Sequence, residues 1–371
     1  MRVVIAPDSF KGTVTAAEAA EALAEGWRRI RPQDTLRLLP LADGGEGTLA
    51  AVLRAGPGAS IHSVPGCTGP DGRPVTGCFA LLPDGTAVVE LATASGLPLL
   101  TVPDPLGATT RGTGETIAAA LDHGAERLVI GVGGSASTDG GTGLLRALGL
   151  EFYDPDGRPL PDGGGALAGV AGVDRTRLRS EPPGGVRVLT DVVNPLLGPA
   201  GAAAVYGPQK GADAEQIAVL EQGLARLAGL LGGDPSAPGA GAAGGTAYGL
   251  CAGWGAQVVP GAAAVAELLG LGAELASADL VISGEGCYDA TSLQGKVVGE
   301  VARQAGAAGA PLAVVAGIAS SDVAQGASPG VPAVLDVLLT LSQLAGSPER
   351  ARSEATHWLR EAGAGLAARH R

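Results

Sequence analysis

Short β-branched runs alternate with helical patterns at both ends of the chain. Arg2–Ala6 predicts a first strand, and Thr15 with Glu18 three residues later has the form of a capping box that begins a helix. Pro32 ends that helix, because proline lacks the N–H that a helix interior needs. Near the C-terminus the same pattern returns, and Ser347, followed by proline, marks the start of a last helix. The predicted strands of these two parts are residues 2–6, 35–39, a run from 279, a run from 312 and a run near 334–340.

Between these ends, from about Gly56, the pattern changes to short strands separated by Pro-Asp-Gly turns. A long helix is predicted over Ala214–Leu231. The next segment, residues 232–245, has the composition of a flexible linker. Its tail, Gly-Ala-Ala-Gly-Gly, instead predicts a second glycine loop of the kind that allows close approach of the backbone. The predicted turns fall at residues 70–72, 83–85 and 155–157.

A chain of 371 residues exceeds what one core usually supports, so we expect two domains. The five strands that alternate with helices predict a flavodoxin-like, doubly wound parallel sheet. This α/β sheet is interrupted after its second βα unit by an inserted α/β domain with a mixed sheet. The predicted boundaries are residues 1–60 plus 262–371 for the first domain and 61–261 for the insertion.

The stretch Glu126–Leu150 is the richest in candidate chemistry, since an apolar strand runs into glycines and hydroxyls before a helical pattern resumes. Glycines let a backbone approach an anion and present N–H groups to it, and the following helix dipole favours negative charge. Asp139 would repel a bare phosphate unless a cation lay between them. The stretch therefore predicts a site for metal and phosphate together.

Composition narrows the classes of partner. The apolar content of 46% against 17% charged residues indicates a globular protein, and the net charge of -12 offers no basic surface for nucleic acid or anionic lipid. No apolar run approaches the roughly 18 residues of a membrane span. Asp8 and Lys11 come too early for a signal peptide, and the four cysteines form no C-x-x-C pair. We expect a cytoplasmic protein with small-molecule or protein partners; the oligomeric state is not predicted.

Lysine and asparagine are almost eliminated from the chain. Lys11, Lys210 and Lys296 stand among 25 basic side chains, and Asn194 is the only asparagine. Each lysine is next to a glycine in a polar loop. One hypothesis is that these positions need lysine specifically; the alternative is chance retention.

Polar side chains gather where predicted strands end, which is where open α/β sheets bind ligands. An isolated Asp-Gly is usually only a turn, but a recurring set of carboxylates, glycines and the three lysines at strand ends is harder to explain that way. The loops that follow the strands include residues 284–289 and 317–322. The candidate side chains are Asp8, Ser9, Lys11, Asp43, Glu46, Ser135, Ser137, Thr138, Asp139, Asp191, Asn194, Glu285, Asp289 and Lys296.

This set favours phosphoryl transfer. None of the four histidines lies in these loops, which removes Ser-His-Asp hydrolysis and His-ligated metal chemistry, and Cys287 has no partner for a nucleophilic role nearby in sequence. Carboxylates that hold Mg²⁺, lysines and an Asp base are the parts of a kinase for a small hydroxylated substrate. One alternative is an NAD(P)-dependent oxidoreductase of a small hydroxy acid, since residues 131–136 match G-x-G-x-x-A and Asp154 follows at a suitable distance. Another is a non-enzymatic binding protein for a sugar acid.

Several long motifs also occur in a characteristic order: APDSFKG, PLADGGEGT, GVGGSASTDGGTGLLRALG, TDVVNPLLGPAGAAAVYGPQKGA, GAAGG and DLVISGEGCYD. In these motifs the chain resembles the bacterial glycerate kinases of the class I type, the glycerate 2-kinases, nearly end to end. The resemblance implies a flavodoxin-like domain with a second α/β domain inserted in it. It also implies ATP-dependent phosphorylation of D-glycerate with Mg²⁺, 2-phosphoglycerate being favoured over 3-phosphoglycerate.

The chain departs from this family after Gly-Glu-Gly. Members commonly have Arg there and, past the Asp, a Gln-Thr or Gln-Ser pair, whereas this chain has Cys287 and Tyr288 before Asp289, followed by Ala290 and Thr291. The absent arginine removes one candidate contact to carboxylate or phosphate.

The prediction for the site is thus a cleft between the two domains of an ATP:glycerate phosphotransferase. Asp191 is the first candidate for general base and Asp43 the second, and Lys11 neutralises phosphate or binds the substrate carboxylate. The candidate metal ligands are Asp8, Asp139, Glu285 and Asp289. The candidate residues for substrate and phosphate are Ser9, Gly133, Gly134, Ser135, Ser137, Asn194, Lys210 and Lys296.

Overall fold

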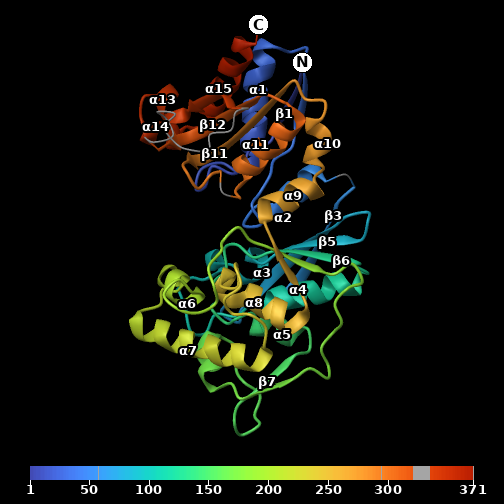
Figure 1. Ribbon diagram of the computed structural model, residues 1–371, viewed down its shortest axis with the longest axis vertical. Helices are drawn as coiled ribbons and strands as arrows, with labels where there is room; N and C mark the ends of the chain where they lie inside the picture. The colour runs from blue at the N-terminus through green and yellow to red at the C-terminus, as the bar shows by residue number, and fades with distance from the viewer. Residues whose placement is uncertain (57, 294, 321–334, 371) are drawn as a thin grey trace. The chain divides into compact units, whose positions relative to one another are not determined.

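The computed structural model describes residues 1–56, 58–293, 295–320 and 335–370. The chain divides into two compact units (Figure 1). The first unit consists of Met1–Asp43, Ala50–Gly56 and Pro260–Arg371, and the second of Gly44–Leu49 and Pro57–Val259. The second unit is thus inserted in the first, and a short piece of the Ala-Asp-Gly-Gly-Glu-Gly loop also belongs to it.

The first unit contains a five-stranded sheet in which all neighbouring strands are parallel. The spatial order is β13-β12-β11-β1-β2. Counted along the described strands of this unit, this is the order 2-1-3-4-5 of flavodoxin-like sheets, so the predicted fold is confirmed. The strands are β1 (Arg2–Ile5), β2 (Thr35–Leu38), β11 (Leu280–Tyr288), β12 (Leu312–Ala319) and β13 (Leu335–Thr340).

Two long helices of the first unit, α1 (Ala16–Ile30) and α15 (Ala355–Arg369), lie side by side (Figure 1). Gly26 and Gly363 lie at their contact, and a Cβ on either glycine would clash with backbone of the other helix. Thr15 caps α1 in the predicted capping box, and Trp27 is buried in the core. The other helices are α2 (Thr48–Ala55), whose first two residues belong to the second unit, α9 (Gly261–Leu268), α10 (Leu271–Leu275), α11 (Val297–Ala308), α13 (Leu341–Ala345) and α14 (Pro348–Ser353).

The second unit is built on a six-stranded mixed sheet of order β10-β9-β6-β5-β4-β3. The neighbours from β10 to β5 are parallel, whereas β5-β4 and β4-β3 are antiparallel hairpins closed by the predicted Pro-Asp-Gly turns. The strands are β3 (Ser60–Thr68), β4 (Pro74–Leu81), β5 (Thr86–Glu90), β6 (Arg127–Gly131), β9 (Val186–Leu189) and β10 (Gln257–Val259), with a separate pair of β7 (Glu151–Tyr153) and β8 (Gly172–Asp174).

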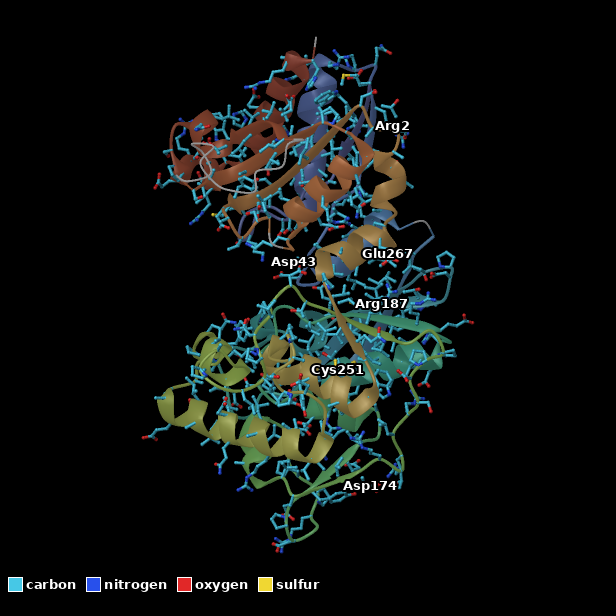
Figure 2. All side chains as sticks on the ribbon, viewed as in Figure 1. Arg2, Asp43, Asp174, Arg187, Cys251 and Glu267 are labelled. Atoms are coloured by element: carbon cyan, nitrogen blue, oxygen red, sulfur yellow. The ribbon has the colours of Figure 1, made fainter. Side chains whose placement is uncertain are left out.

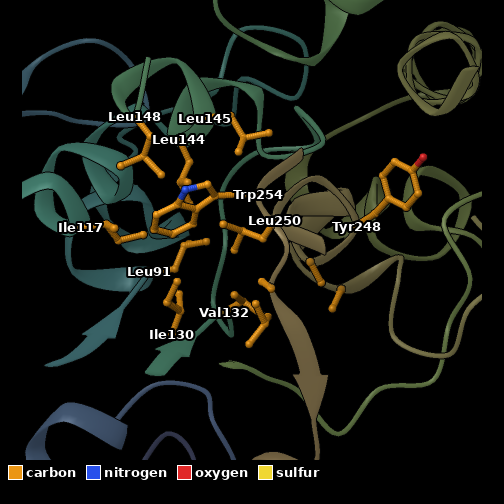
Figure 3. Packing of buried hydrophobic residues seen from close by; sticks show 14 of the residues in the cluster. Leu91, Ile117, Ile130, Val132, Leu144, Leu145, Leu148, Tyr248, Leu250 and Trp254 are labelled. Atoms are coloured by element: carbon orange, nitrogen blue, oxygen red, sulfur yellow. The ribbon is translucent and has the colours of Figure 1, made fainter. Parts of the chain in front are cut away.

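Helices of the second unit bury a core of aliphatic side chains around Trp254 (Figure 3). Leu91, Ile117, Leu144 and Leu250 belong to this core and are fully buried. The predicted helix Ala214–Leu231 is present as α7. The remaining helices are α3 (Ala92–Ser95), α4 (Arg111–Asp122), α5 (Thr142–Ala147), α6 (Ala202–Tyr206) and α8 (Ala242–Trp254), with 3₁₀ turns at Leu97–Leu99, Gly164–Gly169 and Pro208–Lys210.

Three local predictions need correction. Residues 284–289 were predicted as a loop, but β11 continues to Tyr288, because Gly284 and Gly286 lie against neighbouring backbone and Glu285 pairs with Ala316. The predicted last helix is two helices, α14 and α15, which are separated at Glu354. Of the predicted loop 317–322, residues up to Ala319 belong to β12, and the part from 321 lies outside the described residues, as does Val334.

Candidate functional site

A pocket of about 270 Å³ lies in the first unit, at the carboxyl ends of β1 and β11. The strand order changes direction between these two strands, which is the position where open α/β sheets bind ligands. Six of the predicted site residues line this one pocket. They are Asp8, Ser9, Lys11, Asp43 (Figure 2), Glu285 and Lys296.

Asp8 follows β1 and is only 8% exposed. Its Oδ1 accepts a 2.6 Å hydrogen bond from the backbone N–H of Ser9. Burial and the nearby carboxylate of Asp43 raise the pKa of Asp8 to about 7, although the Ser9 N–H and Lys11 oppose this. Asp8 is therefore a carboxyl that changes charge near neutral pH and would gain from a cation beside it.

Glu285 is only 7% exposed, and its Oε1 atom is buried without a hydrogen-bond partner among the described residues. Burial raises the pKa of Glu285. A buried oxygen without a partner is costly, so it is either protonated or completed by a ligand. Because the side chain lines the pocket, the ligand could reach it from there.

The two lysines of the pocket differ in their contacts. Lys11 has a largely exposed side chain, and its Nζ lies 3.8 Å from Oδ2 of Asp43. Lys296 precedes α11 and donates a 2.8 Å hydrogen bond to Oγ1 of Thr291. The Thr291 hydroxyl in turn donates to Asp289 and lowers the pKa of that carboxyl. Asp289 is thus linked to Lys296 through Thr291.

Cys287 also lines the pocket, on the exposed end of β11. Burial and the carboxylates of Asp289 and Glu285 raise the pKa of its thiol. A raised pKa keeps the sulfur protonated at neutral pH and therefore poorly nucleophilic. All four cysteines are free.

In the second unit, Lys210 reaches the glycine-rich loop after β6. Its side chain is 2% exposed, and Nζ donates a 2.8 Å hydrogen bond to Oγ of Ser135 and another to the carbonyl oxygen of Ser137. Burial lowers the pKa of Lys210 to about 7, and the charge of Asp139 opposes this. The structure therefore brings Lys210, Ser135 and Ser137 together, and their role in binding phosphate stays a prediction.

Asp139 is fully buried, and both of its carboxylate oxygens accept hydrogen bonds, from the loop, from the start of α5 and from Thr110 just before α4. Oδ1 accepts from the Ser137 hydroxyl and the Gly141 N–H, both at 3.1 Å. Oδ2 accepts from the N–H and hydroxyl of Thr110, each at 2.8 Å, and from the Gly143 N–H at 3.3 Å. Burial raises the pKa of Asp139, and these hydrogen bonds oppose the rise. The carboxylate is therefore already supplied with donors by the protein.

The glycines of this loop serve close packing. A Cβ on Gly133 would clash with Gly45, and Gly134 has the left-handed φ of 74° that glycine adopts readily. A Cβ on Gly244 would clash with the carbonyl of Ser137, and Gly244 also has a positive φ, of 64°. The Gly-Ala-Ala-Gly-Gly segment thus packs closely against the backbone of the loop after β6.

Asp191 and Asn194 lie in a separate loop after β9. Nδ2 of Asn194 donates to the carbonyl of Ala200 at 2.8 Å, and its Oδ1 accepts from the Tyr206 hydroxyl at 2.6 Å. These contacts fix the shape of the loop. Asp191 is half-buried two residues after the end of β9.

Sequence reasoning missed Glu90 and Arg352. The buried carboxylate of Glu90 accepts from the N–H groups of Gly47 and Leu49, at 3.3 and 3.0 Å, and so holds the start of α2. Arg352, on α14, lines the pocket of the first unit. Glu90 ends a strand like the other candidates, which is a usable signal, whereas nothing in the sequence around Arg352 indicates a site.

Comparison with known proteins identifies the family. The family model for the glycerate kinase family matches residues 3–370, nearly the whole chain. The chain belongs to the glycerate kinase family. Glycerate kinases are phosphotransferases, and the chain is accordingly an enzyme of that class.

Individual relatives agree with the family match. The chain is 45% identical to glycerate kinase of Bacillus subtilis (strain 168) over 334 residues, which cover 87% of this chain and 86% of the relative. It is 40% identical to glycerate 2-kinase of Escherichia coli (strain K12) over 353 residues, which cover 93% and 92%. A crystal structure of a protein assigned as glycerate kinase 2 from Salmonella typhimurium LT2 matches with a TM-score of 0.84 at 39% identity, over 99% of this chain and 97% of that one. In the described part of the chain, no helix is long and apolar enough to span a membrane.

Proposed function

We propose that the chain transfers the γ-phosphoryl group of ATP to a hydroxyl of D-glycerate. The observation that carries this proposal is the pocket at the carboxyl ends of β1 and β11, where carboxylates and lysines predicted from separate loops line one space. Its volume of about 270 Å³ lies just below the usual range of ligand pockets, about 300–1,000 Å³. Such a pocket suits a small acid better than a whole nucleotide.

In the transfer, the hydroxyl oxygen of glycerate bonds to the γ-phosphorus, the bond from that phosphorus to the β-γ bridging oxygen breaks, and the hydroxyl proton passes to a carboxylate. Asp191 is our first candidate for this carboxylate. Asp43 is the second, and its place in the pocket 3.8 Å from Lys11 supports it. Comparing Asp191→Asn with Asp43→Asn by single-turnover kinetics distinguishes them, since only loss of the base slows the chemical step.

The residues of the pocket fit a magnesium ion. The unpartnered Oε1 of Glu285 and the carboxyl of Asp8 are hard oxygen donors, the type that Mg²⁺ prefers. Among the described residues no group of three His, Cys, Asp or Glu could hold a metal by itself. This fits Mg²⁺, which is usually held by one or two carboxylates together with substrate phosphates. We propose Asp8 and Glu285 as ligands, with Asp289 nearby; bound there, the ion would neutralise charge on the transferring phosphoryl group.

The loop after β6 in the second unit is our candidate for binding the phosphates. The Ser135 hydroxyl, hydrogen-bonded to Lys210, and the exposed backbone of Gly134 are the groups that we propose for this role. The amides of Gly133 and Ala136, which the sequence also suggested, already donate to the carbonyls of Gly44 and Ser95. We propose that the substrates lie between this loop and the pocket of the first unit, so that the active site is a cleft between the two units. Asp139 supports this loop through the hydrogen bonds it accepts, which favours a positioning role over metal ligation.

We further propose that the 2-hydroxyl is the acceptor, and the name of the Escherichia coli relative, glycerate 2-kinase, supports this. The test is ADP release with D-glycerate and Mg-ATP, followed by ³¹P NMR of the product. ADP with 2-phosphoglycerate is the expected result. Production of 3-phosphoglycerate would contradict the choice of hydroxyl alone.

Two other outcomes would contradict the kinase itself. Binding of glycerate without ADP release would indicate a binding protein. Protection against thermal unfolding by NADH but not by Mg-ATP would favour the oxidoreductase. A cytoplasmic location stays a prediction, supported by four free cysteines.

A further inference from the structure

Arg352 is the third basic side chain that lines the pocket of the first unit, after Lys11 and Lys296. The helix that carries it contains none of the sequence motifs that resemble those of glycerate kinases. Arg352 lies on α14 and lines the pocket together with Asp8, Glu285 and Lys296. Arg352 is exposed, and among the described residues its guanidinium forms no hydrogen bond or ion pair, although three carboxylates line the same pocket. An arginine in this position has its five N–H donors available for a ligand.

The helix that carries Arg352 is held in place. Ser347 caps it by accepting a 3.2 Å hydrogen bond from the Arg350 N–H, Pro348 occupies its first turn, and Ala351 is buried. Arg350 is two residues before Arg352, about 200° around the helix. Its guanidinium lies over the Trp358 ring, 5.4 Å from the centroid, and donates to the Ala345 carbonyl. Arg350 thus contacts neighbouring helices, whereas Arg352 lines the pocket.

The charged side chains that line the pocket indicate which kind of ligand Arg352 would bind. In their ionised forms Asp8, Asp43 and Glu285 repel an anionic ligand, so a cation beside the ligand's carboxylate would favour binding of an acid. Lys11 lies beside Asp43, and Lys296 is hydrogen-bonded to Thr291. Arg352 is the remaining basic side chain of the lining, and a planar guanidinium matches a carboxylate through two parallel hydrogen bonds.

We propose that Arg352 binds the carboxylate of the acceptor and so selects a short hydroxy acid over a neutral polyol. This inference rests on the proposed function and assigns the acid's carboxylate to one end of the pocket. The hydroxyl to be phosphorylated then points away from α14, toward Asp8, Asp43 and Lys11. Arg352 is a specificity-determining residue in this arrangement.

The decisive variants are Arg352→Gln and Arg352→Lys, with Arg350→Gln as the matched control on the same helix. Loss of a bidentate contact to a charged group is expected to raise KM for glycerate roughly 10- to 100-fold in Arg352→Gln. KM for ATP stays within about twofold, because the nucleotide does not use this contact. Arg352→Lys recovers only part of the loss, since an ammonium lacks the planar fork.

The preference for glycerate over neutral acceptors is a second measurement, and it would not change if Arg352 had only a structural role. Wild-type protein is expected to use glycerate far better than glyceramide or glycerol, and Arg352→Gln to lose most of this discrimination because its activity on the neutral acceptors is retained. Cys287 lines the same pocket, so Cys287→Arg combined with Arg352→Gln returns a guanidinium to it. Partial recovery of KM for glycerate in this double variant is expected.

The outcomes separate the inference from the proposed function. If wild-type protein releases no ADP with glycerate, the proposed function fails; protection from thermal unfolding by glycerate in wild type and not in Arg352→Gln would still support the contact. If wild type is active and Arg352→Gln keeps its KM for glycerate, or raises KM only for ATP, the inference is overturned. An equal rise in KM for glycerate in Arg350→Gln would also overturn it, because the effect would then come from the helix.

Discussion

Nζ of Lys210 donates a 2.8 Å hydrogen bond to Oγ of Ser135, a residue 75 positions earlier in the chain. The lysine also donates to the Ser137 carbonyl and is almost completely buried. The contact ties the glycine-rich loop after β6 to the Pro208–Lys210 turn. A charge so placed is costly to bury, which makes its protonation a measurable property of the folded state.

We expect the protonation of Lys210 to make the free energy of unfolding increase with pH. Its pKa of about 7 in the folded protein lies below the value of about 10.4 in an unfolded chain. Between these values the unfolded chain binds more protons, so the free energy of unfolding increases with pH and is lowest, for this group, at pH 7 and below. The full gain is on the order of 5 kcal/mol. Urea unfolding from pH 6.5 to 9.5 should show a steeper rise in wild type than in Lys210→Met; parallel curves would contradict the buried, depressed lysine.

We expect Asp8 to have the opposite effect, so that its contribution to the free energy of unfolding decreases as pH rises. Its pKa of about 7 in the folded protein lies above the value of about 3.9 in an unfolded chain, so the folded state binds more protons between these pH values. Stability due to Asp8 is then full below about pH 4 and falls until about pH 7. Asp8→Asn keeps an oxygen for the Ser9 N–H but carries no charge. We expect it to be more stable than wild type by a few kcal/mol at pH 8 and similar at pH 4, while its activity is lost. A variant that is less stable than wild type at pH 8 would refute this.

Asp139→Asn tests whether Asp139 supports the loop or holds the metal. In wild type both carboxylate oxygens of Asp139 accept hydrogen bonds from N–H groups. In the variant one of these oxygens is replaced by an NH₂ group, which would face N–H donors in either orientation of the carboxamide. We expect a loss of about 3 kcal/mol in the free energy of unfolding, larger than that of Ser137→Ala, which removes a single donor. The Mg²⁺ concentration for half-maximal activity should not change. A large rise in that concentration at unchanged stability would instead assign Asp139 to the metal.

Gly244→Ala should destabilise the second unit by about 2 kcal/mol or more. The new Cβ would clash with the Ser137 carbonyl, and the φ of 64° is unfavourable for alanine. Gly229→Ala is the control, because this exposed glycine lies inside α7 with nothing within 4 Å of its Cβ position. Alanine there should stabilise by about 0.5–1 kcal/mol. Urea midpoints of the two variants should shift in opposite directions, and shifts of the same sign would show that the close approach is not tight.

The parts of the fold that depend on local pattern could be predicted from the sequence. The capping box at Thr15, the helix Ala214–Leu231 and the hairpin turns are set by neighbouring residues, and the alternation of strands and helices then leaves few topologies. The extension of β11 to Tyr288 could not be predicted, because its Gly-Glu-Gly segment becomes a strand only by pairing with β12.

The site divides in the same way. Strand-end carboxylates and rare lysines indicated Asp8, Lys11, Glu285 and Lys210, since their residue types and their positions after apolar runs are visible in the sequence. Which of them meet in one unit depends on strand order. Arg352 follows an ordinary helix start, so the sequence does not indicate it as a site residue. Only the packing of α14 beside the pocket places it there.

The pairing of β1 with β11 sets the order in which the protein can assemble during synthesis. Val3 pairs with Leu280, so β1 cannot pair with β11 until the long segment between them, which includes the whole inserted unit, has been synthesised. The inserted unit is nearly continuous from Pro57 to Val259 and can fold earlier. Until then β1 and β2 have open edges, which pair readily with other chains. In the nascent chain β1 and β2 therefore depend on a partner strand that is synthesised only after the inserted unit.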